Sequence, residues 1–195
     1  MKLMNLTVTL EIQKFKFTNF LKSYITSVKP VYLIICVIMF ITLTAVSIYL
    51  KKKHNTENIK LFTITILPVY LFAVYSSLVF SRVAYPTYNY SLIPFYSYYQ
   101  TIKGIEKLAM EIIGNIIMLM PVGILLPFNL KKNKFKTTLI IGFLITFSIE
   151  FMQLIFKKGL FETDDLIDNT LGVVLGYLIY KIICSVIEKH KRKAD

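Results

Sequence analysis

Carboxylate and amide side chains are concentrated at the start of one apolar segment, from Phe161 to Gly176 (FETDDLIDNTLGVVLG). Such groups can act as acids or bases, hold a hard cation, or accept hydrogen bonds from a ligand. Four residues are spaced so that a helix places them on one face: Asp165, Asn169, Gly172 and Gly176. The stretch therefore predicts a helix with a polar entrance and a thin glycine surface, facing a partner helix.

The elements that position these residues follow from composition. The 195-residue chain is 55% hydrophobic and only 17% charged, with a mean hydropathy of +0.61, unlike a soluble globular domain. A helix needs about 20 apolar residues to cross roughly 30 Å of hydrocarbon. Five segments meet this requirement, at about 30–50, 61–80, 110–130, 137–156 and 166–187. We expect an all-α polytopic membrane protein with five transmembrane helices.

The distribution of lysine and arginine predicts the side of the membrane that each loop faces. The net charge of +12 would suggest a nucleic-acid partner if the basic residues lay on one soluble face. Instead, 13 of the 23 lie in segments 51–60, 131–136 and 181–193, on one side of a five-helix layout. By the positive-inside rule this side, with the C-terminus, is predicted to be cytoplasmic. We therefore expect contacts with the lipid bilayer, including anionic lipid, and no nucleic-acid partner.

The chain divides into three parts, of which the transmembrane domain at 30–187 is the largest. Residues 1–29 have no continuous apolar core and so lack the pattern of a cleavable signal peptide. An apolar stripe between Phe17 and Val28 is typical of a helix lying on the membrane surface, so we expect 1–29 to be interfacial. Residues 188–195 are predicted to form a basic cytoplasmic tail.

Polar groups inside membrane spans are candidates for function, because an unpaired one in hydrocarbon is costly in free energy. In the predicted topology these groups fall near the outer ends of their helices. The candidate ligand-binding residues are Arg82, Asn115, Glu150, Gln153, Asp165 and Asn169. Together with the loop described next, five chain segments deliver polar groups to one locus near the outer leaflet.

The longest connection, residues 81–109, holds six of the chain's 13 tyrosines. Pro86 and Pro94 interrupt it, which argues against one continuous helix. Its rings are typical of an interfacial belt that anchors a loop at the level of the lipid headgroups. They are also consistent with a re-entrant loop that offers aromatic faces to a sugar, a lipid headgroup or an aromatic ligand.

Several of these residues also have a structural interpretation. Asp164 can cap the fifth helix, where a carboxylate meets the positive end of the helix dipole. Gly172 and Gly176 form a small-xxx-small pair, which is typical of close helix packing. Glu150 lies inside the fourth span, where an ion pair with Arg82 is compatible with a binding role.

Cysteine and histidine limit the chemistry that the sequence predicts. Cys36 and Cys184 fall inside predicted spans, so we expect no disulfide framework. His54 and His190 lie in lysine-rich cytoplasmic flanks, which argues against zinc or Ser-His chemistry at the acidic stretch. The carboxylates leave a Mg²⁺ or Ca²⁺ site open, since hard cations take oxygen ligands. We assign no metal and no cofactor.

Three blocks of residues within 82–180 resemble the VanZ-like family of small bacterial membrane proteins. They are Ser91–Phe95 (SLIPF), Asn115–Pro127 (NIIMLMPVGILLP) and Ser148–Gln153 (SIEFMQ), the last followed by 164–172 (DDLIDNTLG). Their order and spacing together carry the resemblance. The chain departs from the family pattern at Ser91, where asparagine is usual, and at Glu162, where aspartate is usual.

The resemblance implies a phenotype rather than a reaction. Family members are linked to lowered susceptibility to teicoplanin-type lipoglycopeptides without the altered peptidoglycan precursor that other resistance proteins make. We therefore expect a non-enzymatic protein whose outward-facing polar residues bind a lipid-linked cell-envelope ligand or a lipoglycopeptide. Two alternatives stay open: a membrane enzyme acting on a lipid phosphate or glycosyl carrier through Glu150 or Asp165, and a small transporter subunit.

Overall fold

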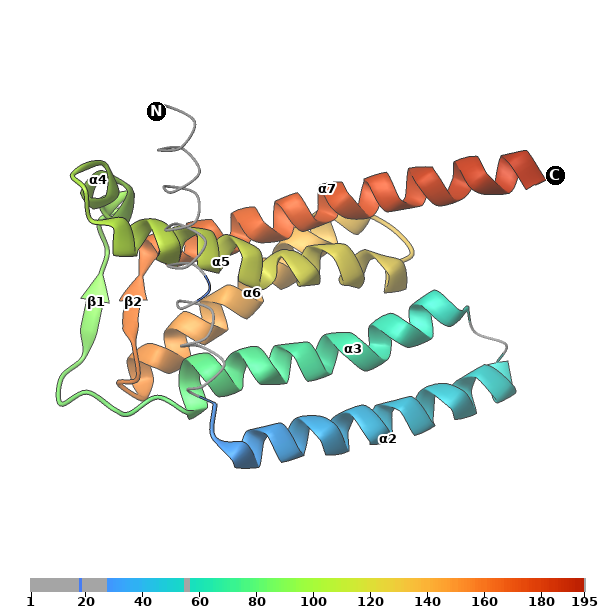
Figure 1. Cartoon of the computed structure of the whole chain (residues 1–195), viewed down its shortest axis with the longest axis horizontal. Coiled ribbons are helices and arrows are strands. Elements are labelled where there is room, and N and C mark those ends of the chain that lie inside the picture. Colours follow the sequence, from blue (N-terminus) through green and yellow to red (C-terminus); the bar gives the residue numbers. More distant parts are fainter. Residues whose placement is uncertain (1–17, 19–27, 55–56, 195) are drawn as a thin grey trace, which may run out of the picture.

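The computed structural model describes residue 18, residues 28–54 and residues 57–194. Within them, five long helices lie roughly along the long axis of the molecule (Figure 1). They are α2 (Pro30–His54), α3 (Asn58–Tyr75), α5 (Glu106–Leu125), α6 (Lys134–Ile155) and α7 (Thr163–Ala194). Each contributes to a segment long and apolar enough to cross a membrane. The expected all-α polytopic membrane protein with five transmembrane helices is therefore confirmed.

Four of the helices, α3, α5, α6 and α7, begin three or four residues before the apolar segments that predict them. The first residue of α5 is Glu106 rather than Met110, and that of α7 is Thr163 rather than Leu166. Polar residues at the start of a helix lower the hydropathy of the segment, although they form part of its first turn. Acidic residues there are also stabilised by the positive end of the helix dipole. Hydropathy alone therefore places these starts too late.

The closest helix packing is between α5 and α7, and glycine makes it possible. A Cβ atom at Gly172 would overlap the carbonyl oxygen of Ile116, and one at Gly176 would overlap that of Met120. Gly123 of α5 approaches the backbone of α7 in the same way. The predicted small-xxx-small packing is therefore confirmed.

Two clusters of buried apolar side chains contribute to the packing of the helices. The first joins α3 and the π-helical turn η1 (Ser76–Phe80) to α6, and consists of Val74, Leu78, Val79 and Ile149. The second joins α5 to α7, and consists of Leu119, Val122 and Val173. Helix α2 packs mainly against α3 and lies at the edge of the bundle (Figure 1).

Short elements close one end of the bundle. The α3–α5 connection contains strand β1 (Asn89–Ser91) and helix α4 (Tyr96–Ile102), and the α6–α7 connection contains strand β2 (Leu160–Glu162). The strands pair in parallel, with Asn89 opposite Leu160. They are the two arrows in Figure 1, and they join connections that are far apart in the sequence. At the other end, the 3-10 turn η2 (Leu126–Asn129) extends α5.

The predicted division of the chain at residues 29 and 187 stays a prediction. Most of the interfacial segment 1–29 lies outside the described residues. The predicted tail continues α7 as far as Ala194, so its described part is helical.

Candidate functional site

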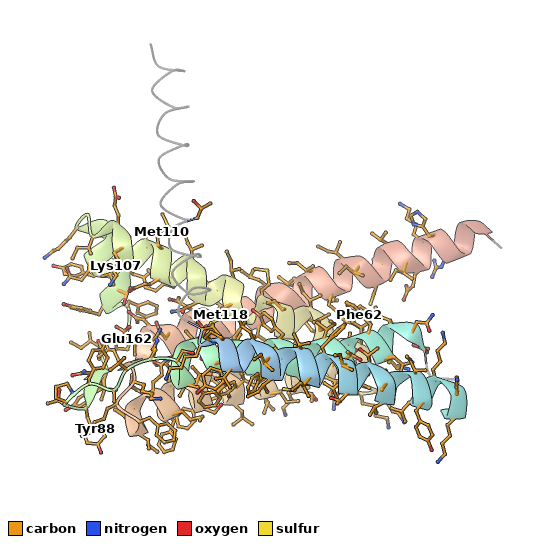
Figure 2. The ribbon with its side chains drawn as sticks, turned by 60° about the horizontal axis from the view of Figure 1, so that its bottom comes forward. Phe62, Tyr88, Lys107, Met110, Met118 and Glu162 are labelled. Atoms are coloured by element: carbon orange, nitrogen blue, oxygen red, sulfur yellow. The ribbon has the colours of Figure 1, made fainter. Side chains whose placement is uncertain are left out.

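Seven of the chain's 11 acidic residues gather at the end of the bundle closed by connections 81–105 and 156–162, which we call the acidic end. The seven are Glu106, Glu111, Glu150, Glu162, Asp164, Asp165 and Asp168. Figure 2 shows Lys107 and Glu162 at this end and Phe62 toward the opposite end. The opposite end, which carries the lysine-rich loops, is the basic end.

Two buried aspartates of α7 fix the tyrosine-rich connection. Asp164 accepts the backbone N–H of Phe95 on Oδ1 at 2.5 Å and that of Ser97 on Oδ2 at 2.7 Å. The phenol of Tyr98 donates to Oδ1 of Asp168. Capping of α7, the helix to which Asp164 belongs, was one of the two roles that the sequence left open for this residue. Instead, both of its oxygens hold the start of α4, because the connection folds back over the first turn of α7.

The surroundings of Tyr98 keep its phenol protonated. Burial raises the pKa of Tyr98, and the hydrogen bond to Asp168 and the negative charges of Asp168 and Asp164 raise it further. Because the phenolate is disfavoured, Tyr98 remains a hydrogen-bond donor near neutral pH. The connection is thus held by side-chain bonds as well as by the β1–β2 pairing.

Beneath this connection, three helices each bring one polar side chain to a common cluster. Asn115 of α5 donates from Nδ2 to Oδ1 of Asp165 on α7 at 2.7 Å. Glu150 of α6 is 1% exposed, and its Oε2 accepts the backbone N–H of Glu162 at 3.3 Å. Glu150 and Asp165 lie near enough for their negative charges to repel each other. The structure thus brings together three of the predicted residues, and their role in binding stays a prediction.

A second polar pair continues the cluster between α6 and α7. Asn169 donates from Nδ2 to Oγ1 of Thr146 at 2.9 Å, and both side chains are buried. Oδ1 of Asn169 and Oδ2 of Asp168 are buried without a hydrogen-bond partner among the described residues. Because buried polar atoms are nearly always paired, these two oxygens are available to a further donor.

The polar side chains between α6 and α7 form a row that runs from Glu150 and Asp165 to Asn169 and Thr146. The row ends in the middle of the bundle. One helical turn beyond Thr146 on α6 lies Gly142, which packs against the side chain of Val173. Val173 in turn belongs to the buried apolar cluster with Leu119 and Val122. The polar groups that begin at the acidic end therefore meet a layer of close apolar packing.

Among the described residues, the other two predicted residues form no side-chain hydrogen bond with the cluster. Gln153 is buried and contacts Gly159, where a Cβ atom would overlap its Oε1. Arg82 follows η1 and lines a cavity of about 330 Å³ with Lys158. Arg82 attracts the charge of Glu150, but the described residues contain no direct ion pair between the two. The Arg82–Glu150 bridge considered from the sequence is therefore absent, and Arg82 lines the cavity instead.

Glu162 adds a further carboxyl group to the acidic end. Burial raises the pKa of Glu162, and the charges of Glu111, Asp164 and Asp168 raise it further, while Lys107 lowers it. Lys107 itself pairs with Glu111 at 3.3 Å. Within the described part of the chain, no three His, Cys, Asp or Glu side chains are arranged to hold a metal ion.

Sequence reasoning missed Tyr98, Thr146 and Lys158. Thr146 lies four residues before Glu150, and this spacing was a signal that it shares the same helix face. Tyr98 is one of six tyrosines in its connection, and nothing in the sequence distinguishes it from the others. The pairing of β1 with β2 also lacked a signal, because each strand has only three residues.

The fold and this site define a class of protein, a polytopic membrane protein with acidic and amide side chains clustered at one end of its helices. The α3–α5 connection covers this cluster and is hydrogen-bonded to α7. A model of the VanZ/LLP1 family matches residues 30–184, and the chain belongs to this family. The family expected from the sequence is therefore confirmed. The match begins well before residue 82, so it includes α2 and α3 as well.

Among curated proteins, Protein VanZ of Enterococcus faecium is 28% identical to this chain over 97 residues. The aligned region makes up 47% of this chain and 60% of that relative, so the chain spans less than two thirds of the relative's length. No solved structure matches the chain. Family membership and the apolar helices indicate a membrane protein, whereas the orientation of its C-terminus stays a prediction.

Proposed function

We propose that this VanZ-family protein binds a lipid-linked cell-envelope ligand or a lipoglycopeptide at the acidic end, which faces outward, and that it does so without catalysing a reaction. The observation that carries the proposal is a cluster of three polar side chains from three different helices: Asn115, Glu150 and Asp165. The cluster lies beneath the α3–α5 connection, which hydrogen bonds hold to α7. In this account the protein lowers susceptibility to teicoplanin-type drugs, as expected from its family.

The energetic cost of the cluster supports a functional role. Burying a carboxylate costs several kcal/mol in order of magnitude unless it is paired and hydrogen-bonded. Glu150 is almost fully buried, yet no cation pairs with it directly among the described residues. Two carboxyl groups at these buried positions also add nothing to the apolar packing between the helices. A ligand that donates hydrogen bonds or carries positive charge compensates this cost.

The chemistry of the surroundings fits an amphipathic ligand. Carboxylate and amide oxygens accept hydrogen bonds from the hydroxyl, amide and amine groups of sugars and peptides. The nearby connection exposes large apolar side chains, including Leu92 at 59% and Ile93 at 65%. An apolar chain can lie against such residues while the polar part of the ligand contacts the cluster.

The interruption of the polar row favours binding over transport. A transporter site lies near the middle of the membrane and opens to each side in turn. Here the charged groups lie at one end, and Gly142 and Val173 pack closely beyond them. We therefore prefer a site that receives its ligand from one side of the membrane.

Drug susceptibility tests the proposal. The wild-type protein and the variants Glu150→Gln and Asp165→Asn are expressed at equal membrane levels, and susceptibility to teicoplanin is compared with that to vancomycin. We expect the wild type to lower teicoplanin susceptibility selectively and both variants to lose this effect. The matched control is Glu188→Gln, which removes an exposed carboxylate from the basic end.

Amide variants keep the size of the side chain, so they change charge with little change in packing. Loss of the effect in both variants, with Glu188→Gln unaffected, supports a site at the acidic end. Equal susceptibility of cells with the wild type, either variant or no protein contradicts binding of this drug class.

A further inference from the structure

The acidic end also contains a cavity with basic side chains, separate from the carboxylate cluster. Its volume is about 330 Å³, and its walls come from the segment after η1 and from the turn after α6. The lining residues are Arg82, Val83, Ala84, Tyr85 and Lys158. Two cationic groups thus face one cavity, although this end holds most of the acidic residues.

Among the described residues, the side chains of Arg82 and Lys158 make fewer interactions than that of the neighbouring Lys157, which is held by a carbonyl and an aromatic ring. Lys157 donates to the carbonyl of Pro86 at 3.4 Å and lies over the ring of Tyr88, 4.5 Å from its centroid. Lys158 donates to the carbonyl of Phe80 at 3.2 Å, which leaves two of its three N–H groups. Arg82 makes no side-chain hydrogen bond or direct ion pair with any described residue.

The backbone of the cavity wall adds further donors. Tyr85 donates its N–H to the carbonyl of Lys157 at 2.7 Å, which fixes the wall against the α6–α7 turn. The N–H groups of Val83 and Ala84 donate to no acceptor among the described residues. Free donors and two positive charges around one cavity match an anion with several oxygen atoms.

We propose that this cavity binds the phosphate group of a lipid, with Arg82 and Lys158 as the residues that contact its oxygens. This proposal rests on the proposed function, because it takes the ligand to be lipid-linked. It adds that the ligand carries a phosphate group and that this group binds in the cavity. Arginine suits this role because its planar guanidinium forms two parallel hydrogen bonds to a phosphate.

The position of the cavity supports a lipid as the source of the phosphate. Arg82 and Lys158 follow the ends of two membrane-spanning segments, at Phe80 and Ile155, where lipid headgroups lie. Val83, which lines the cavity, is 86% exposed and offers an apolar contact beside the charges. The carboxylate of Glu150 attracts Arg82, but it is buried and already accepts a backbone N–H.

Native mass spectrometry of the full chain in a phosphate-free detergent tests this proposal. The protein is titrated with phosphatidic acid, with the corresponding diacylglycerol, and with inorganic phosphate. We expect phosphatidic acid to bind at least about tenfold more tightly than diacylglycerol, the factor that one hydrogen bond to a charged group supplies. Arg82→Gln and Lys158→Gln should each weaken phosphatidic acid binding by about the same factor.

The matched control is Lys103→Gln, which removes an exposed lysine of the acidic end that lies outside the cavity. Circular dichroism checks that each variant remains helical. Displacement of the lipid by inorganic phosphate means that the phosphate group alone is the ligand, and failure to displace it means that the lipid chains contribute. Both results support the site.

The proposal is overturned if diacylglycerol binds as tightly as phosphatidic acid. It is also overturned if Arg82→Gln and Lys158→Gln bind phosphatidic acid like the wild type, or if Lys103→Gln loses as much affinity as they do. These outcomes leave the proposed function standing, because the susceptibility test changes Glu150 and Asp165 and not the cavity.

Discussion

Removing the carboxylate of Asp164 should detach the α3–α5 connection from α7. The change Asp164→Ala leaves the backbone N–H groups of Phe95 and Ser97 without their acceptor. Phe95 also has a left-handed backbone conformation, with φ of 62°, which is unfavourable for a residue other than glycine. The Asp164 carboxylate is therefore the contact that holds the first turn of α4 in place.

The size of the effect follows from the two lost bonds. A hydrogen bond to a charged group contributes about 1.5–3 kcal/mol, so the pair contributes about 3–6 kcal/mol to the attachment of α4. Tyr98 still donates to Asp168, and β1 still pairs with β2, so the connection is not fully released. Since about 1.4 kcal/mol corresponds to a factor of ten, amide protection should fall by at least about 100-fold.

Hydrogen–deuterium exchange of the detergent-solubilised protein measures this loss in peptides that cover residues 95–102. The control variant is Glu188→Ala, at the basic end, which should leave these peptides protected. If Asp164→Ala and Glu188→Ala exchange at the same rate over 95–102, Asp164 does not hold the connection and our reasoning about it is wrong.

Three further predictions concern the helix contact, the cluster and pH. Gly172→Ala should lower the free energy of unfolding by about 1–3 kcal/mol, because the added methyl overlaps the carbonyl of Ile116. Asn115→Leu should abolish the effect on teicoplanin susceptibility as Asp165→Asn does, because it removes the donor to Asp165. The pKa of Glu162 is raised from 4.5, so the folded protein keeps a proton that the unfolded chain releases, and stability should fall as pH rises above that value. Glu162→Gln should flatten this fall.

Each of these predictions has its own measurement and control. Thermal unfolding in detergent compares Gly172→Ala with Leu171→Ala, which changes an exposed neighbour; equal stability of the two contradicts the close packing of α5 and α7. Susceptibility assays compare Asn115→Leu with Asp165→Asn, and a fully active Asn115→Leu contradicts a shared role. Melting temperatures between pH 4 and pH 8 test Glu162→Gln, and a slope like that of the wild type contradicts the pKa shift of Glu162.

The number and order of the helices could be predicted because crossing a membrane demands long apolar segments. The meeting of Asn115 with Asp165 could also be anticipated, since polar groups inside apolar spans must find partners. The close packing at Gly172 and Gly176 could be predicted as well, because two small residues four positions apart are typical of a helix contact. These features depend on residue type and spacing alone.

The folded-back connection could not be predicted, because its contacts depend on the path of the backbone. Asp164 lies in the first turn of α7, but its oxygens accept the backbone N–H groups of Phe95 and Ser97, far earlier in the chain. Arg82 and Glu150 are brought to the same end by topology, yet Arg82 lines a cavity with Lys158 instead of pairing with Glu150. Which of several neighbours a long side chain contacts is decided by packing, and a single sequence does not record it.

The orientation of the acidic end tests the account most directly, because a ligand of the cell envelope must reach it from outside. In a background of Cys36→Ser and Cys184→Ser, the variants Val83→Cys and Lys132→Cys are treated in intact cells with a membrane-impermeant thiol reagent. Val83 is 86% exposed at the acidic end, and Lys132 is exposed at the basic end. We predict that Val83→Cys is labelled in intact cells and Lys132→Cys only after permeabilisation. Labelling of Lys132→Cys alone in intact cells contradicts an outward-facing site.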